Sequence, residues 1–484
     1  MPDEHWQVSE VAHRVVFGTG GQTWEWHSDV AIRSYLHPLL FSIPYYIARF
    51  FNMDSDLFIA YGPRLFQAVF AACGDVAYHS IAKSLFGFEV AVWSTTLYLT
   101  NWFSVFALGR TLGNSIACSV TLVALALHFE GHRVLGAAFA GFAVALRQTS
   151  ALFLAPFYLC TISRIRDYWK SILVGCLMLS SGILIDSLYY TPPYDTQQLL
   201  PIRITAINFF KINFARGLSS LYGEHVAVWY FLVGIPFFFL GGLLSFLSCF
   251  WHRPLTDQRW LAIIIGCCFE IGLLSFSGHK ELRFVMTSLV CLSMVSGTPQ
   301  SSRRGSRATK LTTWLILIPH ALVAVFFSRW YCAGADRLMR DLRRELRVTK
   351  SRPTRVMFLT ACHGTPYHAY LHEASVSSSV ELDFLDCAPR CFAGRPCEGR
   401  SDRVEFFESP KEWTRRNLDR ITNSSFLVLY SPVETDAAFM ADLEDLGFTK
   451  ISVVFDSLLN EAPGEKSSVV RDAKFTLLKW RNPR

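Results

Sequence analysis

Long apolar segments fill the chain before position 330, and they limit the folds that it can adopt. Candidate membrane spans lie at 32–52, 64–85, 89–108, 113–129, 134–146, 149–163, 170–189, 227–250, 260–277, 282–298 and 311–328. An α-helix needs about 20 apolar residues to cross a bilayer. Charged residues make up 18% of the chain, whereas an average soluble protein has about 25%. Residues 1–328 are therefore expected to form a polytopic α-helical membrane domain.

Two of these segments, 134–146 and 149–163, are short for a complete span. They are predicted to form a broken pair around Arg147-Gln148-Thr149. The net charge of +7 comes from basic residues scattered over short loops, as membrane topology requires. This distribution does not indicate binding to nucleic acid.

Residues 329–484 are more polar and are expected to fold as a separate domain. Leucines spaced four apart predict a basic amphipathic helix, and short apolar runs predict buried strands. The expected helices are 337–347 and 434–446, and the expected strands are 355–359, 426–430 and 451–455. Alternation of strands with helices favours a small α/β domain.

Basic loops predict which side of the membrane each segment faces, because loops rich in Lys and Arg stay in the cytosol. The loops at 299–310, 252–259 and 164–170 carry this excess. The turn at 278–281, the loop at 190–226 and all residues after 328 are then expected on the lumenal side. The sequon Asn423-Ser424-Ser425 agrees with a lumenal tail, and Asn423 is predicted to be glycosylated.

The polar and aromatic residues 1–31 show no cleavable signal peptide, because a basic region followed by an apolar one is missing. If every candidate segment spans the membrane, residues 1–31 are cytosolic. If one piece of 113–163 is re-entrant, they are lumenal. The second arrangement is favoured, because this segment carries the acidic residues that a lumenal site would need.

Thirteen cysteines are present. Most lie inside apolar runs, where a thiol behaves as a small hydrophobic group. The chain has no Cys-x-x-Cys pair, so no metal site is expected.

The turn His279-Lys280-Glu281-Leu282-Arg283-Phe284 places four charged or chargeable residues between two apolar segments. Such a turn lies at the water interface or lines a polar cavity. It resembles the His-Lys-Glu-x-Arg-Phe signature of glycosyltransferase family 22, whose members take mannose from dolichyl-phosphate mannose. The beginning of the chain is similar to the first lumenal loop of that family, in Pro2-Asp3-Glu4-His5-Trp6-Gln7 and the following residues to Trp26.

The resemblance implies the GT-C fold and a set of roles for residues of this chain. Asp3 and Glu4 correspond to the acidic pair that supplies the catalytic base, and Lys280 and Arg283, with His279, would neutralise the phosphate of the donor. The residues expected to contact the substrates are Trp6, Gln7, Glu10, Arg33, Tyr222 and His225. No cofactor and no metal are implied, since the leaving group is a lipid monophosphate. The family also implies a first membrane helix before the acidic loop, whereas Met1 here directly precedes Pro2.

The tail, in 361–367 and 384–389, resembles those family members that add the third, α1,2-linked mannose to the glycosylphosphatidylinositol (GPI) precursor. This resemblance implies a multi-pass protein of the endoplasmic reticulum membrane that binds dolichyl-phosphate mannose and a glycolipid acceptor. Cys362 and Cys387 follow probable strands and are predicted to form a disulfide. A family enzyme of N-glycan assembly, and a lipid or sugar transporter without chemistry, remain as alternatives.

Overall fold

The computed structural model describes most of the chain. The described residues are 2–162, 165–191, 201–219, 223–252, 257–298, 307–349, 354–360, 364–388, 401–461 and 469–481. These residues divide into two compact units. The sheet unit consists of Met1–Val30, Pro38–Pro63 and Phe326–Arg484, and the helical unit consists of Ala31–His37 and Arg64–Val325.

This grouping differs from the predicted division at residue 328. The first 30 residues belong with the tail rather than with the apolar helices. The reason is that their buried side chains pack into the core of the sheet unit, as described below.

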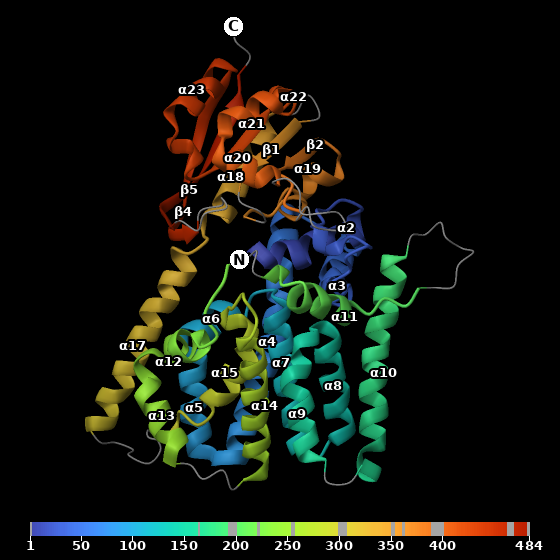
Figure 1. The fold of residues 1–484 in the computed structure, drawn as a ribbon, viewed down its shortest axis with the longest axis vertical. Coiled ribbons are helices and arrows are strands. Elements are labelled where there is room, and N and C mark those ends of the chain that lie inside the picture. The colour runs from blue at the N-terminus through green and yellow to red at the C-terminus, as the bar shows by residue number, and fades with distance from the viewer. Residues whose placement is uncertain are drawn as a thin grey trace. The chain divides into compact units, whose positions relative to one another are not determined.

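The helical unit is built from apolar helices (Figure 1). Its helices are the greater part of α4 (Asp56–Phe86), α5 (Phe88–Thr100), α6 (Trp102–Ala107), α7 (Gly113–Phe129), α8 (Arg133–Leu146), η3 (Gln148–Ser150), α9 (Ala151–Thr161), α10 (Ile165–Tyr190), α11 (Thr205–Phe210), η4 (Lys211–Ala215), η6 (Tyr230–Gly234), α12 (Ile235–Phe239), η7 (Leu240–Gly242), α13 (Leu243–His252), α14 (Gln258–Ser275), η8 (Leu282–Val285), α15 (Met286–Ser293) and most of α17 (Arg307–Arg329), where η marks 3-10 and π-helices.

Five helical stretches among the described residues are long and apolar enough to cross a membrane. They are Asp56–Phe86, Arg166–Tyr190, Tyr230–Cys249, Gln258–Ser275 and Lys310–Val348. The chain is thus a multi-pass membrane protein. The predicted span at 32–52 is instead α3 (Leu36–Phe50), a helix of 15 residues that falls short of this length.

The predicted break near residue 147 is confirmed. Helix α8 ends at Leu146, Arg147 adopts an extended conformation (φ −148°, ψ 106°), and α9 begins at Ala151. Helix α8 also packs closely on α10, because a Cβ atom on Gly141 would lie 2.5 Å from the carbonyl oxygen of Gly175. Small residues permit this close approach between membrane helices.

The sheet unit contains a five-stranded sheet in the order β2-β1-β3-β5-β4. Strands β2 (Val380–Phe384), β1 (Thr354–Leu359) and β3 (Phe426–Tyr430) are parallel, whereas β5 (Val469–Trp480) runs antiparallel to β3 and to β4 (Phe448–Glu461). The predicted strands at 355–359, 426–430 and 451–455 are confirmed. Strand β5 was not predicted, and for β2 only a strand before Cys387, without bounds, was expected.

Helices cover both faces of this sheet (Figure 1). One face packs on α20 (Asp402–Glu408), α21 (Pro410–Arg416), α22 (Leu418–Thr422) and α23 (Ala437–Asp445), through Phe406, Trp413, Ile421 and Phe439. The other face packs on α18 (Gly334–Val348), through Leu338, Met339 and Leu342. Side chains of β1 alternate between the two cores, as the period of two in a strand requires.

The beginning of the chain completes the second core. Its elements are α1 (Pro2–Glu4), the π-helix η1 (His5–Ser9), α2 (Glu10–Phe17) and η2 (Trp24–Trp26). Trp6, Ala12 and Val16 share one buried core with residues of β1, β3 and β5, of α3 and of the first turns of α4. The short elements η9 (His368–Tyr370), α19 (His372–Val376) and η10 (Val433–Thr435) finish the unit.

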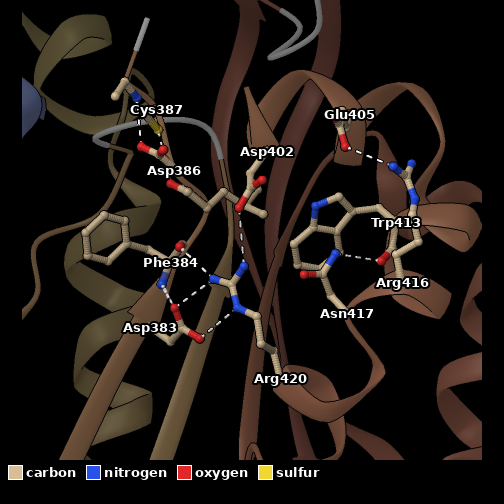
Figure 2. Close-up of polar contacts among 12 residues, drawn as sticks. Asp383, Phe384, Asp386, Cys387, Asp402, Glu405, Trp413, Arg416, Asn417 and Arg420 are labelled. Carbon is tan, nitrogen blue, oxygen red and sulfur yellow. Dashed lines mark hydrogen bonds and ion pairs between the residues drawn. The ribbon is translucent and has the colours of Figure 1, made fainter. Parts of the chain in front are cut away.

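An ion-pair network ties β2 to α22 (Figure 2). Arg420 donates to both carboxylate oxygens of Asp383, at 3.1 and 2.8 Å, and pairs with Asp402 at 3.3 Å. Arg355 pairs with Asp383 at 2.9 Å. Although partial burial alone would raise the pKa of Asp383, the hydrogen bonds from Arg420 and the charges of both arginines lower it.

We predict that Arg420→Gln loosens β2 and α22, because it leaves the partly buried Asp383 with one cationic partner. The expected loss is about 1–3 kcal/mol of local stability, measured by hydrogen exchange at neutral pH. The low pKa of folded Asp383 means that its pairing stabilises the fold above the unfolded pKa of about 3.9. That contribution disappears as pH falls through the folded pKa, so variant and parent should converge in acid.

Arg416→Gln is the matched control, since the Arg416–Glu405 pair at 3.3 Å is more exposed (Figure 2). Exposed ion pairs contribute about 0–1 kcal/mol. Equal losses for the two variants would contradict the prediction.

Candidate active site

The acidic pair lies in the first helical turns of the sheet unit. Asp3 is half-buried, whereas Glu4 is 1% exposed. The Glu4 carboxylate lies 3.8 Å from the His5 imidazole, and the Ser9 hydroxyl donates to the Glu4 carbonyl at 3.1 Å. The π-helix η1 follows the pair directly, and such turns are frequent at functional sites. Because Asp3 is half-buried and Glu4 is almost fully buried, Asp3 is the more accessible of the two carboxylates.

Trp6 and Gln7 continue this helix. Trp6 is buried, its indole N–H donates to the carbonyl of Thr365 at 3.0 Å, and its ring packs edge-on against Tyr367 at 4.6 Å. Gln7 is half-buried. The observed contacts of Trp6 are thus within the protein, and the predicted substrate contacts of both residues stay predictions.

Glu10 is enclosed, with a fully buried side chain. Its carboxylate accepts four backbone N–H bonds, from Gly21, Tyr367, His368 and Ala369, at 2.9–3.1 Å. A substrate contact for Glu10 remains untested. The hydrogen bonds of its carboxylate among the described residues are to backbone N–H groups, and nothing in the local sequence pointed to them.

The cationic turn lies in the helical unit between α14 and η8. Lys280 is 2% exposed, and its ammonium donates to the carbonyl oxygens of His225, at 2.9 Å, and Ser277. Burial lowers the pKa of Lys280. In return, the N–H of His225 donates to the Gly278 carbonyl at 3.0 Å. These bonds leave at most one Lys280 donor for an incoming phosphate.

Glu281 aligns the other two residues of the turn that were predicted to bind phosphate. One carboxylate oxygen of Glu281 contacts the His279 imidazole at 3.0 Å and also accepts a hydrogen bond from the Arg283 guanidinium. The side chains of His279 and Arg283 are 16% and 13% exposed, so neither is fully buried within the protein. Glu281 was not predicted as a site residue, although it belongs to the motif.

His225 lies beside this turn. Its ring stacks on Trp229 at 5.0 Å and lies 6.4 Å from the His279 ring. The structure therefore brings His225, His279, Lys280 and Arg283 together, as a cluster in one unit. Tyr222, also predicted to contact substrate, lies outside the described residues.

One further cation, Arg147, lies near the cluster. The Arg147 guanidinium lies 5.7 Å from the ring of Phe284, beside Arg283. Burial, followed by the positive charges of Arg147 and Arg33, lowers the pKa of His37 to about 3. Arg33 was predicted, but Arg147 was not, since its match to the family was weak. The break between α8 and α9 is the signal that could have identified it.

Asp186 organises the backbone next to Arg33. It accepts hydrogen bonds from the Ser34 hydroxyl at 3.0 Å, the Tyr35 N–H at 2.8 Å and the Thr205 hydroxyl at 2.8 Å. The sequence signal that could have identified Asp186 is its place as a single acidic residue near the end of the apolar helix α10.

The acidic pair and the cationic cluster belong to different units. The predicted cavity between residues 1–31 and 278–284 therefore stays a prediction. Among the described residues, no group of three or more His, Cys, Asp or Glu side chains gathers as metal ligands would.

Two predictions concern modification of the tail. Cys387 is disulfide-bonded, but Cys362 lies outside the described residues, so the pairing itself stays a prediction. Asn423 is exposed at the end of α22. Its side chain is accessible for the predicted glycosylation, which the structure does not test.

Comparison with known proteins identifies the family. Residues 1–372 match the Alg9-like mannosyltransferase family. Mannosyltransferase APTG1 of Arabidopsis thaliana is 31% identical over 81% of this chain and 74% of its own length. GPI mannosyltransferase 3 of Drosophila melanogaster is 30% identical over 86% and 73%. GPI alpha-1,2-mannosyltransferase 3 of Homo sapiens is 26% identical over 95% and 81%.

The fold also has a solved counterpart. The crystal structure of ArnT from Cupriavidus metallidurans bound to undecaprenyl phosphate superimposes with a TM-score of 0.58 at 12% identity, covering 99% of this chain and 93% of that one. This similarity confirms the predicted GT-C fold, while the family match and the relatives confirm the resemblance of the signature turn and the first segment. The chain belongs to the Alg9-like mannosyltransferase family.

Proposed function

We propose that this protein transfers mannose from dolichyl-phosphate mannose to a GPI-anchor precursor, as the third, α1,2-linked mannose. The observation that carries the proposal is similarity over nearly the whole chain, tail included, to relatives named GPI alpha-1,2-mannosyltransferase 3. A donor and an acceptor that are both lipid-linked suit a membrane enzyme. The N-glycan and transporter alternatives gain no comparable support.

The donor phosphate is assigned to the cationic cluster. Arg283 offers a planar fork of donors and is held in place by Glu281. His279 and one remaining donor of Lys280 add to it. Donors fixed before the reaction stabilise negative charge that develops on the leaving phosphate. The stacked rings of His225 and Trp229 offer a surface beside it for the sugar.

The acceptor hydroxyl is assigned to the acidic pair. Its proton must leave as the new bond forms, and a positioned carboxylate can take it. Asp3 is the proposed base because Glu4 is enclosed. A β-linked donor and an α-linked product imply inversion, hence one displacement in which the sugar–phosphate bond breaks as the acceptor oxygen bonds to the anomeric carbon.

The proposed location is the endoplasmic reticulum membrane, with the sheet unit and the site on the lumenal side. The support is the positive-inside pattern of the loops, the disulfide at Cys387 and the exposed sequon at Asn423. Disulfides persist in oxidising compartments. The proposed reaction is tested by incubating membranes with labelled dolichyl-phosphate mannose and resolving the lipid products, with GPI and N-glycan precursors supplied separately.

We predict that Asp3→Asn lowers mannosyl transfer by about 10²–10⁴-fold, the usual contribution of a positioned acid or base, while the protein accumulates normally. Asp29→Asn, an exposed carboxylate of the same segment, is the control and should match the parent. Restoration of surface GPI proteins by Asp3→Asn at matched low expression would show that Asp3 is not the base, and Glu4 would then be tested.

We predict that Arg283→Gln lowers transfer by about 10²–10³-fold, because it removes a charged donor from the leaving phosphate. Arg283→Lys keeps the charge without the planar fork and should lie between that variant and the parent. Arg216→Gln, at an exposed arginine of the helical unit, is the control. Rates for Arg283→Gln equal to those of the control would remove Arg283 from the phosphate site.

We predict that residues 340–484 resist protease in intact microsomes and that Asn423→Gln removes one glycan. Detergent should abolish the protection. Digestion of this region without detergent would place it on the cytosolic side and overturn the proposed orientation, whereas a change in gel mobility with endoglycosidase reports the glycan separately.

A further inference from the structure

One face of the first helical segment, residues 2–17, lies along residues 365–372. Trp6, Glu10 and His13 follow one another at helical spacing, and each makes a polar contact there. The Trp6 indole reaches Thr365, Glu10 reaches the backbone at 367–369, and the His13 imidazole lies 2.9 Å from that of His372. The contact is thus repeated at successive turns of the helix.

Glu10 is the centre of this contact. Its Oε1 accepts the N–H groups of Tyr367 and Ala369, at 2.9 and 3.1 Å, and its Oε2 accepts those of Gly21 and His368, both at 3.1 Å. Only a carboxylate offers acceptors on both atoms, since an amide places donor hydrogens on one of them. Glutamine would therefore direct an N–H₂ group at two N–H donors.

The acidic pair, Asp3 and Glu4, lies close to Glu10 in the chain. Only η1, a π-helix of five residues, separates Glu4 from Glu10. The Ser9 hydroxyl donates to the Glu4 carbonyl across η1, and the His5 ring meets Tyr370 edge-on at 5.2 Å. A shift of the helix at Glu10 is therefore transmitted to Asp3 rather than absorbed by a flexible loop.

We propose that Glu10 is a positioning residue for mannosyl transfer, which fastens residues 367–369 to the first segment and thereby holds Asp3 at the acceptor hydroxyl. The proposal rests on the proposed function. It makes the C-terminal part of the chain a component of the active site. A misplacement of about 1 Å in a reacting group can lower a rate by about 10²-fold, which sets the scale of the expected effect.

The test uses the full chain in membranes, with labelled dolichyl-phosphate mannose and a GPI precursor. Glu10→Gln should lower kcat by about 10–10²-fold and leave the KM for the donor unchanged, because the donor is assigned to the other unit. Glu10→Asp keeps both acceptor atoms on a shorter side chain and should rescue part of the loss. Trp6→Phe, which removes the indole N–H and leaves a smaller aromatic ring, is a second variant should Glu10→Gln fail to accumulate.

Glu434→Gln is the matched control, because it makes the same chemical change as Glu10→Gln. Glu434 is half-buried in the same unit, and its carboxylate accepts hydrogen bonds from the Ser431 hydroxyl at 3.2 Å and from the Thr476 hydroxyl. It therefore tests the loss of a hydrogen-bonded carboxylate remote in sequence from the first segment. Its kcat should equal that of the parent at matched protein level.

A double-mutant cycle separates positioning from general destabilisation. If Glu10 acts through Asp3, Glu10→Gln should cause no further loss in the Asp3→Asn background. Three results would each overturn the proposal. Glu10→Gln could cause the same fold-loss in the parent and in the Asp3→Asn background, Glu10→Gln could have the rate of the parent, or Asp3→Asn could be fully active. Failure of the parent to label any GPI precursor would instead overturn the proposed function.

Discussion

The buried carboxylate of Glu10 is the interaction on which the sheet unit depends. A charge removed from water is costly unless hydrogen bonds replace its hydration, and four backbone N–H groups do so here. Three of those groups come from 367–369, in a region that hydropathy alone would treat as an independent domain. The first segment and the tail therefore form one folding unit.

In the cationic turn, hydrogen bonds likewise replace the hydration of a buried charge, which is here positive. Lys280 is buried against carbonyl oxygens, and Glu281 holds His279 and Arg283. In both places, polar groups of the protein fix a charged group before any substrate arrives. Catalysis by fixed charges benefits from this arrangement, because the groups need not reorganise during the reaction.

The parts of the fold that could be predicted have local signatures. Apolar length indicated the membrane helices, the polar Arg147-Gln148-Thr149 step between two short segments indicated the break after α8, and the short apolar run at 355–359 indicated β1. The bonds of Glu10 could not be predicted, since a carboxylate that binds backbone N–H groups looks the same in sequence as one that faces a substrate. Arg147 and Asp186 were missed because each is a single charge at the end of an apolar segment.

The separation in sequence between Glu10 and its partners has a consequence for biosynthesis. The ribosome must add 357 residues after Glu10 before Tyr367 exists. At roughly 5–20 residues per second this takes roughly 20–70 s. Throughout that interval an acidic, tryptophan-rich segment waits without its binding surface while the membrane helices insert. A chain stalled before residue 367 would therefore leave the Glu10 carboxylate without three of its four backbone N–H partners.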